Sequence, residues 1–441
     1  MKDKISKIVK DQREEMIKMR RDFHRHAEPA WLEFRTASII ALKLSELGYN
    51  LQMGKEVVDE KSRMGVPPAD VLEKDYKRAE EQGADPEFLP NFKGGFTGLT
   101  ATLDTGKPGP VIGLRFDIDS NDLTEPEGKE HIPTQEGFAS INEGAMHACG
   151  HDAHAAIGLG VAAVLAQLKD ELSGKVKFIF QPAEEGVRGA KSMVAAGVTD
   201  DLDLLLAMHI GFGVEELGVF ACGNEQFLAT TKYDVTYKGV PAHAGSSPDE
   251  GKNALLAAAL AVTGLYGIAR HKDGSSRINV GVLKSGSGRN IIPDFAEMKL
   301  EIRGQTTEIN DYMVQKALSV LKGAAQMQEV EYETEEVGGA PASVSSPELV
   351  STLEKITADH PGVKKFLTES PFAGSEDVTY MMQAMDKRNK PSAYLVAGTP
   401  LKSGHHKRDF DFDEEVIPLA ADVISNAVLH LSGNYKQEVS K

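Results

Sequence analysis

The sequence predicts an α/β protein with a mixed, mostly parallel central sheet that is flanked by helices. Three observations support this prediction. Apolar runs at 98–103, 111–116, 175–180 and 204–210 are typical of buried strands. Stretches with helical periodicity separate the last three runs. From residue 230 onward the strands alternate polar and apolar residues around two helices, which indicates a separate α+β domain.

The first hundred residues are predicted to be mainly helical. Apolar residues at helical spacing predict a helix over 5–23, and a second amphipathic helix over 36–47 ends before Gly48. Residues 53–94 carry mixed charges and a predicted helix at 69–82, without a strand signal. We interpret this stretch as an addition to the core fold. It covers a cleft, forms a contact or simply extends into solvent.

Periodicity and turn signals also place the later elements. Predicted helices occupy 151–168, 251–270, 308–321, 347–359, 377–385 and 414–431, and predicted strands occupy 233–238, 278–283, 297–303, 329–335 and 392–397.

Composition limits the classes of function. The 441 residues are enough for two or three domains, and the net charge of −17 argues against binding to nucleic acid or to an anionic membrane. Two cysteines make a disulfide framework improbable and favour a reducing compartment. The first residues lack a signal-peptide pattern, and the apolar stretch 253–269 suits a buried helix. We therefore expect a cytoplasmic protein.

Residues 146–154 concentrate a thiol, three imidazoles and a carboxylate. The thiolate of Cys149 and the imidazole of His151 are two positions apart, so both can reach one metal ion or bridge a pair of ions. Gly150 lets the backbone turn between them. The alternative is a buried cysteine beside a solvated histidine cluster. The density of ligand types favours a metal site.

Carboxylates follow two of the predicted strands. Asp117 comes after the strand at 111–116, and open α/β sheets bind ligands at the carboxyl ends of their strands. Glu184 and Glu185 follow the strand at 175–180 on an irregular turn, where one carboxylate can bind a metal while the other stays free. Helix capping is the alternative for all three residues.

These motifs resemble the amidohydrolase branch of the M20 metallopeptidase family. The resemblance covers nearly the whole chain and rests on residues 20–26, 33–38, 115–119, 146–154, 181–186 and 410–414. It implies a dinuclear site, with manganese as the preferred divalent metal and zinc as the alternative, because zinc suits a thiolate ligand.

The resemblance also implies a role for each ligand. Cys149 bridges the two ions, Glu185 and His406 complete one site, and His151 and His209 complete the other.

Further roles follow from the same family pattern. Glu184 is the expected general acid and base, and Asp117 is expected to orient a metal ligand. His406 stands four residues before Phe410, the offset of the last metal ligand, and His405 is the alternative.

Family members carry a lid and dimerisation domain inserted into the catalytic domain. Here the resemblance implies a catalytic domain at 1–229 and 342–441, with an inserted domain at 230–341.

Loops of the inserted domain resemble the family's substrate-binding loops. His243 is expected to bind the substrate or its oxyanion. Asn290 and Arg303 are expected to hold the free carboxylate of the substrate.

The predicted function is metal-dependent hydrolysis of an N-acyl amino acid. Residues 62–65, 92–98 and 229–232 resemble family members that act on p-aminobenzoyl-glutamate, which implies this substrate, a homodimer and, as a further partner, a related B subunit. The alternatives are a general or hippurate-type hydrolase, a cysteine hydrolase with Cys149 as nucleophile, and a subunit without catalytic activity. A zinc deaminase is excluded because no Pro-Cys-x-x-Cys motif follows the cluster.

Overall fold

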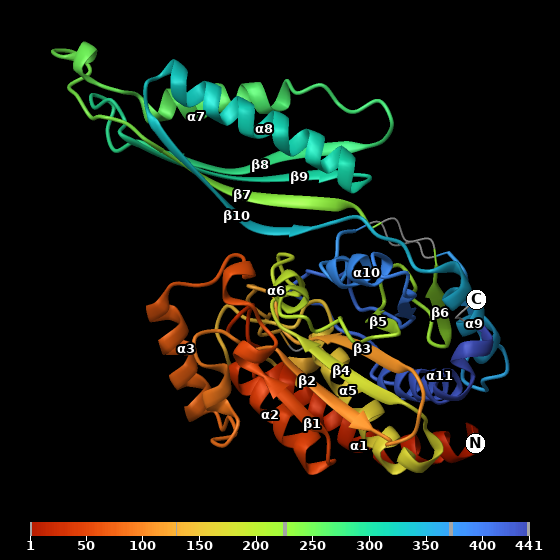
Figure 1. Ribbon diagram of the computed structural model, residues 1–441. Helices are drawn as coiled ribbons and strands as arrows, with labels where there is room; N and C mark the ends of the chain where they lie inside the picture. Colours follow the sequence, from red (N-terminus) through yellow and green to blue (C-terminus); the bar gives the residue numbers. More distant parts are fainter. Residues whose placement is uncertain (1, 129, 224–226, 370–373, 439–441) are drawn as a thin grey trace. The chain divides into compact units, whose positions relative to one another are not determined.

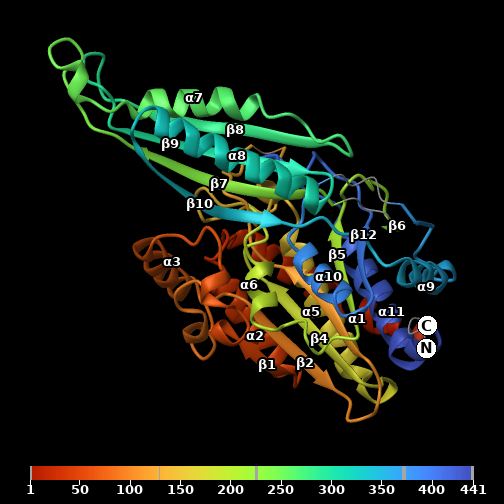
Figure 2. The same ribbon diagram turned by 45° about the horizontal axis from the view of Figure 1, so that its top comes forward.

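The computed structural model describes residues 2–128, 130–223, 227–369 and 374–438, drawn in Figures 1 and 2. The chain forms two compact units. The larger, unit 1, comprises Met1–Glu225, Val344–Phe372 and Tyr380–Lys441, and the smaller, unit 2, comprises Gln226–Ser343 and Ala373–Thr379.

Unit 1 is built on an eight-stranded sheet in the order β1-β2-β4-β3-β5-β12-β6-β11. The strands are β1 (Asn50–Met53), β2 (Leu99–Asp104), β3 (Val111–Asp117), β4 (Lys175–Gln181), β5 (Leu204–Ile210), β6 (Val219–Cys222), β11 (Lys365–Leu367) and β12 (Ser392–Ala397). The pairs β4-β3, β3-β5, β5-β12 and β6-β11 are parallel, and the other three are antiparallel. The predicted mixed, mostly parallel sheet is confirmed.

Helices cover this sheet. They are α1 (Lys2–Arg25), α2 (Phe34–Glu46), α3 (Ala69–Glu81), α4 (Ile132–Gln135), α5 (His151–Gln167), α6 (Ala190–Ala195), α9 (Pro347–Ala358), α10 (Thr379–Asp386) and α11 (Val416–Glu438). The helix α5 packs against β3 and against α1, α2 and α11, so nearly every one of its residues is buried. This explains why α5 is apolar on all sides.

Among the described residues, one helix is long and apolar enough to cross a membrane. It is the segment Val416–Asn434 of α11, and 78% of that window is buried inside the protein. It packs against α1, α5 and α9, as the core helix of a soluble protein does.

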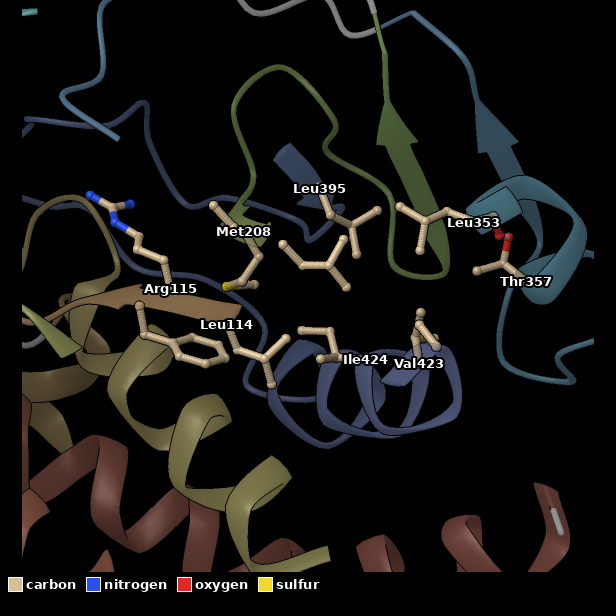
Figure 3. Close-up of a pocket in the computed structure, with 12 residues that line it drawn as sticks. Leu114, Arg115, Met208, Leu353, Thr357, Leu395, Val423 and Ile424 are labelled. Atoms are coloured by element: carbon tan, nitrogen blue, oxygen red, sulfur yellow. Dashed lines mark hydrogen bonds between the residues drawn. The ribbon is translucent and has the colours of Figure 1, made fainter. Parts of the chain in front are cut away.

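A small cavity lies in the core of unit 1 (Figure 3). Its walls come from β3, β5, β12, α9 and α11 and are almost entirely apolar, and its volume of about 20 Å³ is enough for one water molecule. Arg115 lines it only with its stem, since its guanidinium points away toward Gln181 and Asp117. The cavity is therefore a packing gap and not a substrate site.

Unit 2 is an antiparallel four-stranded sheet in the order β10-β7-β9-β8, with two helices on one face. Its elements are β7 (Ala229–Lys238), α7 (Ala254–Tyr266), β8 (Ser276–Ser285), β9 (Phe295–Gly304), α8 (Thr307–Met327) and β10 (Glu331–Ala340). The α+β architecture predicted after residue 230 agrees with these elements. The role of this unit as a lid or dimerisation domain stays a prediction.

Candidate metal and active site

The candidate site lies at the carboxyl ends of β3, β4 and β5, which are adjacent and parallel. Asp117 ends β3, His209 is the second-last residue of β5, and the Glu184–Glu185 turn follows β4. The loop that carries Cys149 leads directly into α5, whose first residue is His151. Four separate segments thus bring their polar side chains to one edge of the sheet.

Gly150 makes the sharp entry into α5. Its φ is +94°, a left-handed conformation that disfavours other residues, and an added Cβ would lie 2.6 Å from Cδ1 of Ile210. The backbone can therefore turn tightly enough to direct Cys149 and His151 toward the same space.

Cys149 belongs to two groups of donor atoms. One group contains Cys149, His151 and His209, and the other contains Cys149, Glu185 and His406. Within each group all donor atoms lie within 4.8 Å of one another. Sγ of Cys149 is 3.5 Å from Nε2 of His209, and Nε2 of His406 is 3.3 Å from Oε1 of Glu185.

The orientation of the histidine rings fits metal binding. Nδ1 of His151 faces the carbonyl of Asp119 at 2.9 Å, and Nδ1 of His209 faces the carbonyl of Ile210 at 2.7 Å. Each Nδ1 therefore donates a proton to a carbonyl, so Nε2 is the ring atom that a cation can bind, after displacing any proton that it carries. Nε2 of His151 is buried and makes no hydrogen bond. The donor set thus fits a pair of divalent cations.

The electrostatics of the site also favour cations. Burial lowers the pKa of His151, but the charges of Asp117, Asp119 and Glu185 outweigh burial and raise that pKa to about 10. Burial holds the pKa of His209 well below its usual value, so this imidazole is neutral. The carboxylates attract positive charge, and His209 offers a lone pair to it.

The turn after β4 holds Glu184 and Glu185 in a strained conformation. Ala183 has a φ of +54°, and the amides of Glu184 and Glu185 donate to the two oxygens of Asp119 at 3.0 and 2.8 Å. The amide of Ala183 donates to Oε1 of Glu33 at 2.8 Å. One carboxylate oxygen each of Glu184 and Glu185 lies within 4.8 Å of a ring nitrogen of His151.

Asp117 lies at the centre of a network of buried polar groups. Its carboxylate bonds Nη1 of Arg115 at 2.6 Å and Nδ1 of His154 at 2.5 Å, and lies 3.8 Å from Nε2 of His151. The Nδ1 atoms of the expected ligands bond backbone carbonyls instead. Asp117 thus adds negative charge beside His151, and its donor atom lies within 4.8 Å of those of His151 and His154. Its predicted role in orienting a metal ligand stays a prediction, and the carbonyl of Asp119 also contacts His151.

Two contributors were missed by sequence reasoning. Asp119 had a usable signal, because it follows a strand end two residues after Asp117. Glu33 belongs to the family-like stretch 33–38, but its partners Thr97 and Ala183 are far away in the sequence, so no pattern indicated these contacts.

The two C-terminal histidines have different surroundings. His406, with a φ of +61°, lies in the donor group of Cys149 and Glu185. Nε2 of His405 faces the carbonyl of Ile210 at 3.2 Å. The geometry favours His406 as the donor.

The predicted substrate residues of unit 2 do not all lie together. His243 and Asn290 belong to adjoining loops, since the amide of Ala244 donates to the carbonyl of Asn290 at 3.0 Å. Arg303 instead pairs in register with Thr230 at the far end of the sheet and binds Glu301. His243 and Arg303 are separated by the length of β9, about 30 Å for ten residues.

Comparison with known proteins decides the family. A family model described as peptidase family M20/M25/M40 matches residues 113–430, more than half of the chain. The chain belongs to this family. As a member of M20 it is a metal-dependent hydrolase of amide bonds.

This M20 chain is similar to several named proteins over nearly its full length. It is 49% identical to the A subunit of p-aminobenzoyl-glutamate hydrolase from Escherichia coli, over 93% of this chain and 94% of that protein. It is also 49% identical to indole-3-acetyl-aspartic acid hydrolase of Enterobacter agglomerans, over 94% and 95%. The crystal structure of an aminobenzoyl-glutamate utilization protein from Klebsiella pneumoniae has a TM-score of 0.86 and 43% identity, and the match covers 99% of this chain and 100% of that one.

Proposed function

We propose that this M20 enzyme hydrolyses p-aminobenzoyl-glutamate to p-aminobenzoate and glutamate. The observation that supports hydrolysis is the Glu184 carboxylate beside two donor groups that share Cys149. The observation that supports the substrate is the 49% identity to the A subunit of p-aminobenzoyl-glutamate hydrolase over almost all of both chains.

The proposed ligands are Cys149, His151, Glu185, His209 and His406, for two divalent cations. Manganese is proposed ahead of zinc on the family resemblance alone, because the softness of these ligands does not decide between the two metals. Cations held there would supply Lewis acidity toward the amide carbonyl and the attacking water.

Glu184 is proposed to move the proton. Its carboxylate takes a proton from the water whose oxygen bonds to the amide carbon, and then delivers it to the amide nitrogen as the C–N bond breaks. The products are a carboxylic acid and a free amine. Its backbone is fixed by Asp119, and its side chain is 7% exposed, so the proton is held away from bulk water.

The loops of unit 2 are proposed to bind the rest of the transition state. Nδ1 of His243 accepts the amides of Gly245 and Ser246 at 3.1 Å, so its proton is on Nε2 and can be donated to an oxyanion. Asn290 and Arg303 are proposed to hold the free carboxylate.

A homodimer is the proposed assembly. His243 and Arg303 of one chain are too far apart to bind one substrate together, whereas the lids of two chains can each supply one end. Unit 2 also exposes large apolar side chains, among them Leu255, Leu256, Tyr266, Leu283 and Phe295. A cytoplasmic location and a related B subunit complete the proposal.

A substrate panel tests the function. Purified enzyme, reloaded with Mn²⁺ or Zn²⁺, is incubated with p-aminobenzoyl-glutamate, hippurate and N-acetyl amino acids, and the released amine is quantified. We expect the highest kcat/KM with p-aminobenzoyl-glutamate and Mn²⁺. A higher value for hippurate would contradict the proposed substrate.

The same preparation separates metal catalysis from a Cys149 nucleophile. A chelator should abolish activity, and adding Mn²⁺ should restore it. Activity that survives complete metal removal would support the cysteine mechanism instead.

A second candidate substrate is indole-3-acetyl-aspartate. The relative named for this activity is also 49% identical over nearly the whole chain. It belongs in the same panel, and a larger kcat/KM for it would replace the first proposal.

A further inference from the structure

Arg188 folds back over the turn that carries Glu184 and Glu185. Its Nε donates to the carbonyl of Glu185 at 2.8 Å, and its guanidinium covers Gly186, where an added Cβ would lie 2.6 Å from Nε. Nη1 donates to the carbonyl of Gly65 at 3.3 Å. In the described part of the chain, this guanidinium therefore donates to carbonyls and to no carboxylate.

Arg63 lies beside the same stretch, two residues before Gly65. Its guanidinium stacks on the ring of Phe96 at 3.7 Å and lies 5.7 Å from the ring of Trp31. Nη1 donates to the carbonyl of Gly94 at 2.8 Å, while the buried Nε makes no hydrogen bond. Burial lowers the pKa of Arg63.

These two arginines differ from three other shielded arginines of unit 1. Arg20, Arg35 and Arg115 each form an ion pair with a carboxylate. Among the described residues, neither Arg63 nor Arg188 does so, although the chain has 66 acidic residues. A fourth, Arg388, also donates to carbonyls and to no carboxylate of the described chain, but its acceptors Thr199, Asp200 and Leu202 precede β5, at the amino end of that strand and not at the carboxyl end where the candidate site lies. A half-buried guanidinium without an anion is unfavourable, and the planar guanidinium fork fits a carboxylate, so Arg63 and Arg188 can bind a carboxylate that a ligand brings.

We propose that Arg63 and Arg188 bind the side-chain carboxylate of the substrate's amino acid, so that the site selects N-acyl derivatives of acidic amino acids. This inference rests on the proposed function, in which the substrate is an N-acyl amino acid. The main-chain carboxylate has Asn290 and Arg303 as its proposed partners, so a second carboxylate requires cations of its own. Because Arg188 donates to the carbonyl of Glu185, its charge lies on the same turn as the proposed proton carrier Glu184.

The test compares two substrates that differ only in charge. Values of kcat/KM are measured for p-aminobenzoyl-glutamate and p-aminobenzoyl-glutamine with wild type, Arg63→Gln, Arg188→Gln and Arg188→Lys. Arg270→Gln, which changes an exposed arginine of unit 2, is the matched control. Circular dichroism and the melting temperature confirm that each variant is folded.

We expect wild type to prefer glutamate by roughly tenfold or more, and each Gln variant to lose most of that preference through a higher KM for glutamate. Arg188→Lys should restore part of it, and Arg270→Gln should keep it. A wild type without preference, or Gln variants that slow both substrates equally, would overturn the inference.

A binding measurement and a change of acyl group keep the two proposals separable. Free glutamate should raise the melting temperature of metal-loaded wild type more than free glutamine does, and Arg188→Gln should lose this difference. If p-aminobenzoyl-glutamate is not cleaved, the proposed substrate is wrong. In that case the charge preference is measured with N-acyl-glutamate and N-acyl-glutamine substrates that carry whichever acyl group the enzyme does cleave.

Discussion

At the scale of single residues, Glu184 and its neighbour Glu185 have different tasks. Burial raises the pKa of Glu185, but His406 and His151 outweigh it and lower that pKa to about 2, so Glu185 remains an anionic donor. Glu184 has its backbone amide fixed by Asp119 while its carboxylate lies near the donors. Two adjacent carboxylates can therefore divide metal binding and proton transfer between them.

We expect Glu184→Gln to lose roughly two or more decades of kcat and to keep two metal ions per chain, because an amide cannot carry the proton. Metal content and turnover are measured on the same sample. Near-normal turnover would contradict the proposed role of Glu184 in proton transfer, and loss of metal would show that Glu184 is a metal ligand.

A second residue-scale prediction concerns acid stability. Burial raises the pKa of Glu125, but hydrogen bonds from His131 and His24 and from the amide of Ser140 outweigh it, and the pKa falls to about 2 from 4.5. This folded-state pKa is below the unfolded value, so the stabilisation is complete above pH 4.5 and is lost as pH falls through about 2.

We expect Glu125→Gln to lower the free energy of unfolding at pH 7 by up to about 3 kcal/mol. The free energy of unfolding of this variant should also fall less steeply than that of wild type between pH 4.5 and 2. Urea denaturation at several pH values measures both effects. Glu87→Gln, at an exposed position, is the control. An unchanged pH dependence would contradict the assignment.

At the scale of elements, the turn after β4 depends on Glu33, which lies directly before α2. Its Oε1 accepts the amide of Ala183, and its Oε2 is 2.6 Å from Oγ1 of Thr97. Burial and the charge of Asp119 raise the pKa of Glu33 to about 8 from 4.5. Glu33 is therefore a positioning residue that is mostly protonated at neutral pH.

We expect Glu33→Gln to keep both hydrogen bonds and most of the activity. Glu33→Ala leaves the Ala183 amide unpaired, so it should lower the free energy of unfolding by about 1–3 kcal/mol and kcat by tenfold or more. Because the folded-state pKa lies above the unfolded one, the contribution of Glu33 to stability is complete below pH 4.5 and is lost as pH rises through about 8.

The Gln variant should not lose this stability as pH rises, and thermal unfolding between pH 4 and 9 measures the difference. Equal activity of the Gln and Ala variants would contradict the positioning role.

Sequence patterns predicted the elements that are long and regularly patterned. The buried strands β2 to β5 were found from their apolar runs, and α5 from a stripe of apolar residues at helical spacing. The strands β1, β6 and β11 have only three or four residues, too few for a period to be seen. The contact of Glu33 with a turn 150 residues away has no local signal, because folding alone creates it.

At the scale of the whole molecule, the separation of His243 from Arg303 leads to a prediction about assembly. In a homodimer, each catalytic site would receive His243 from the lid of the partner chain. Such pairing also protects the open edge strand β8.

We expect Glu184→Ala and His243→Ala homodimers to be nearly inactive, and a co-refolded equal mixture to recover about a quarter of wild-type activity. Random pairing makes half of the dimers mixed, and each mixed dimer has one intact site of two. Native mass spectrometry confirms the mixed dimers. No recovery in their presence would show that His243 acts within its own chain or not at all.

The placement of β12 also has a consequence for biosynthesis. This strand lies between β5 and β6 in the middle of the sheet, yet it is made after all of unit 2, as is His406. While the ribosome is still translating unit 2, the nascent chain already contains β5 with its β12 edge unpaired, and such edges promote aggregation. The enzyme therefore depends on its last fifty residues to close both the sheet and the donor set, so a chain that terminates early would be an insoluble product and a substrate for chaperones.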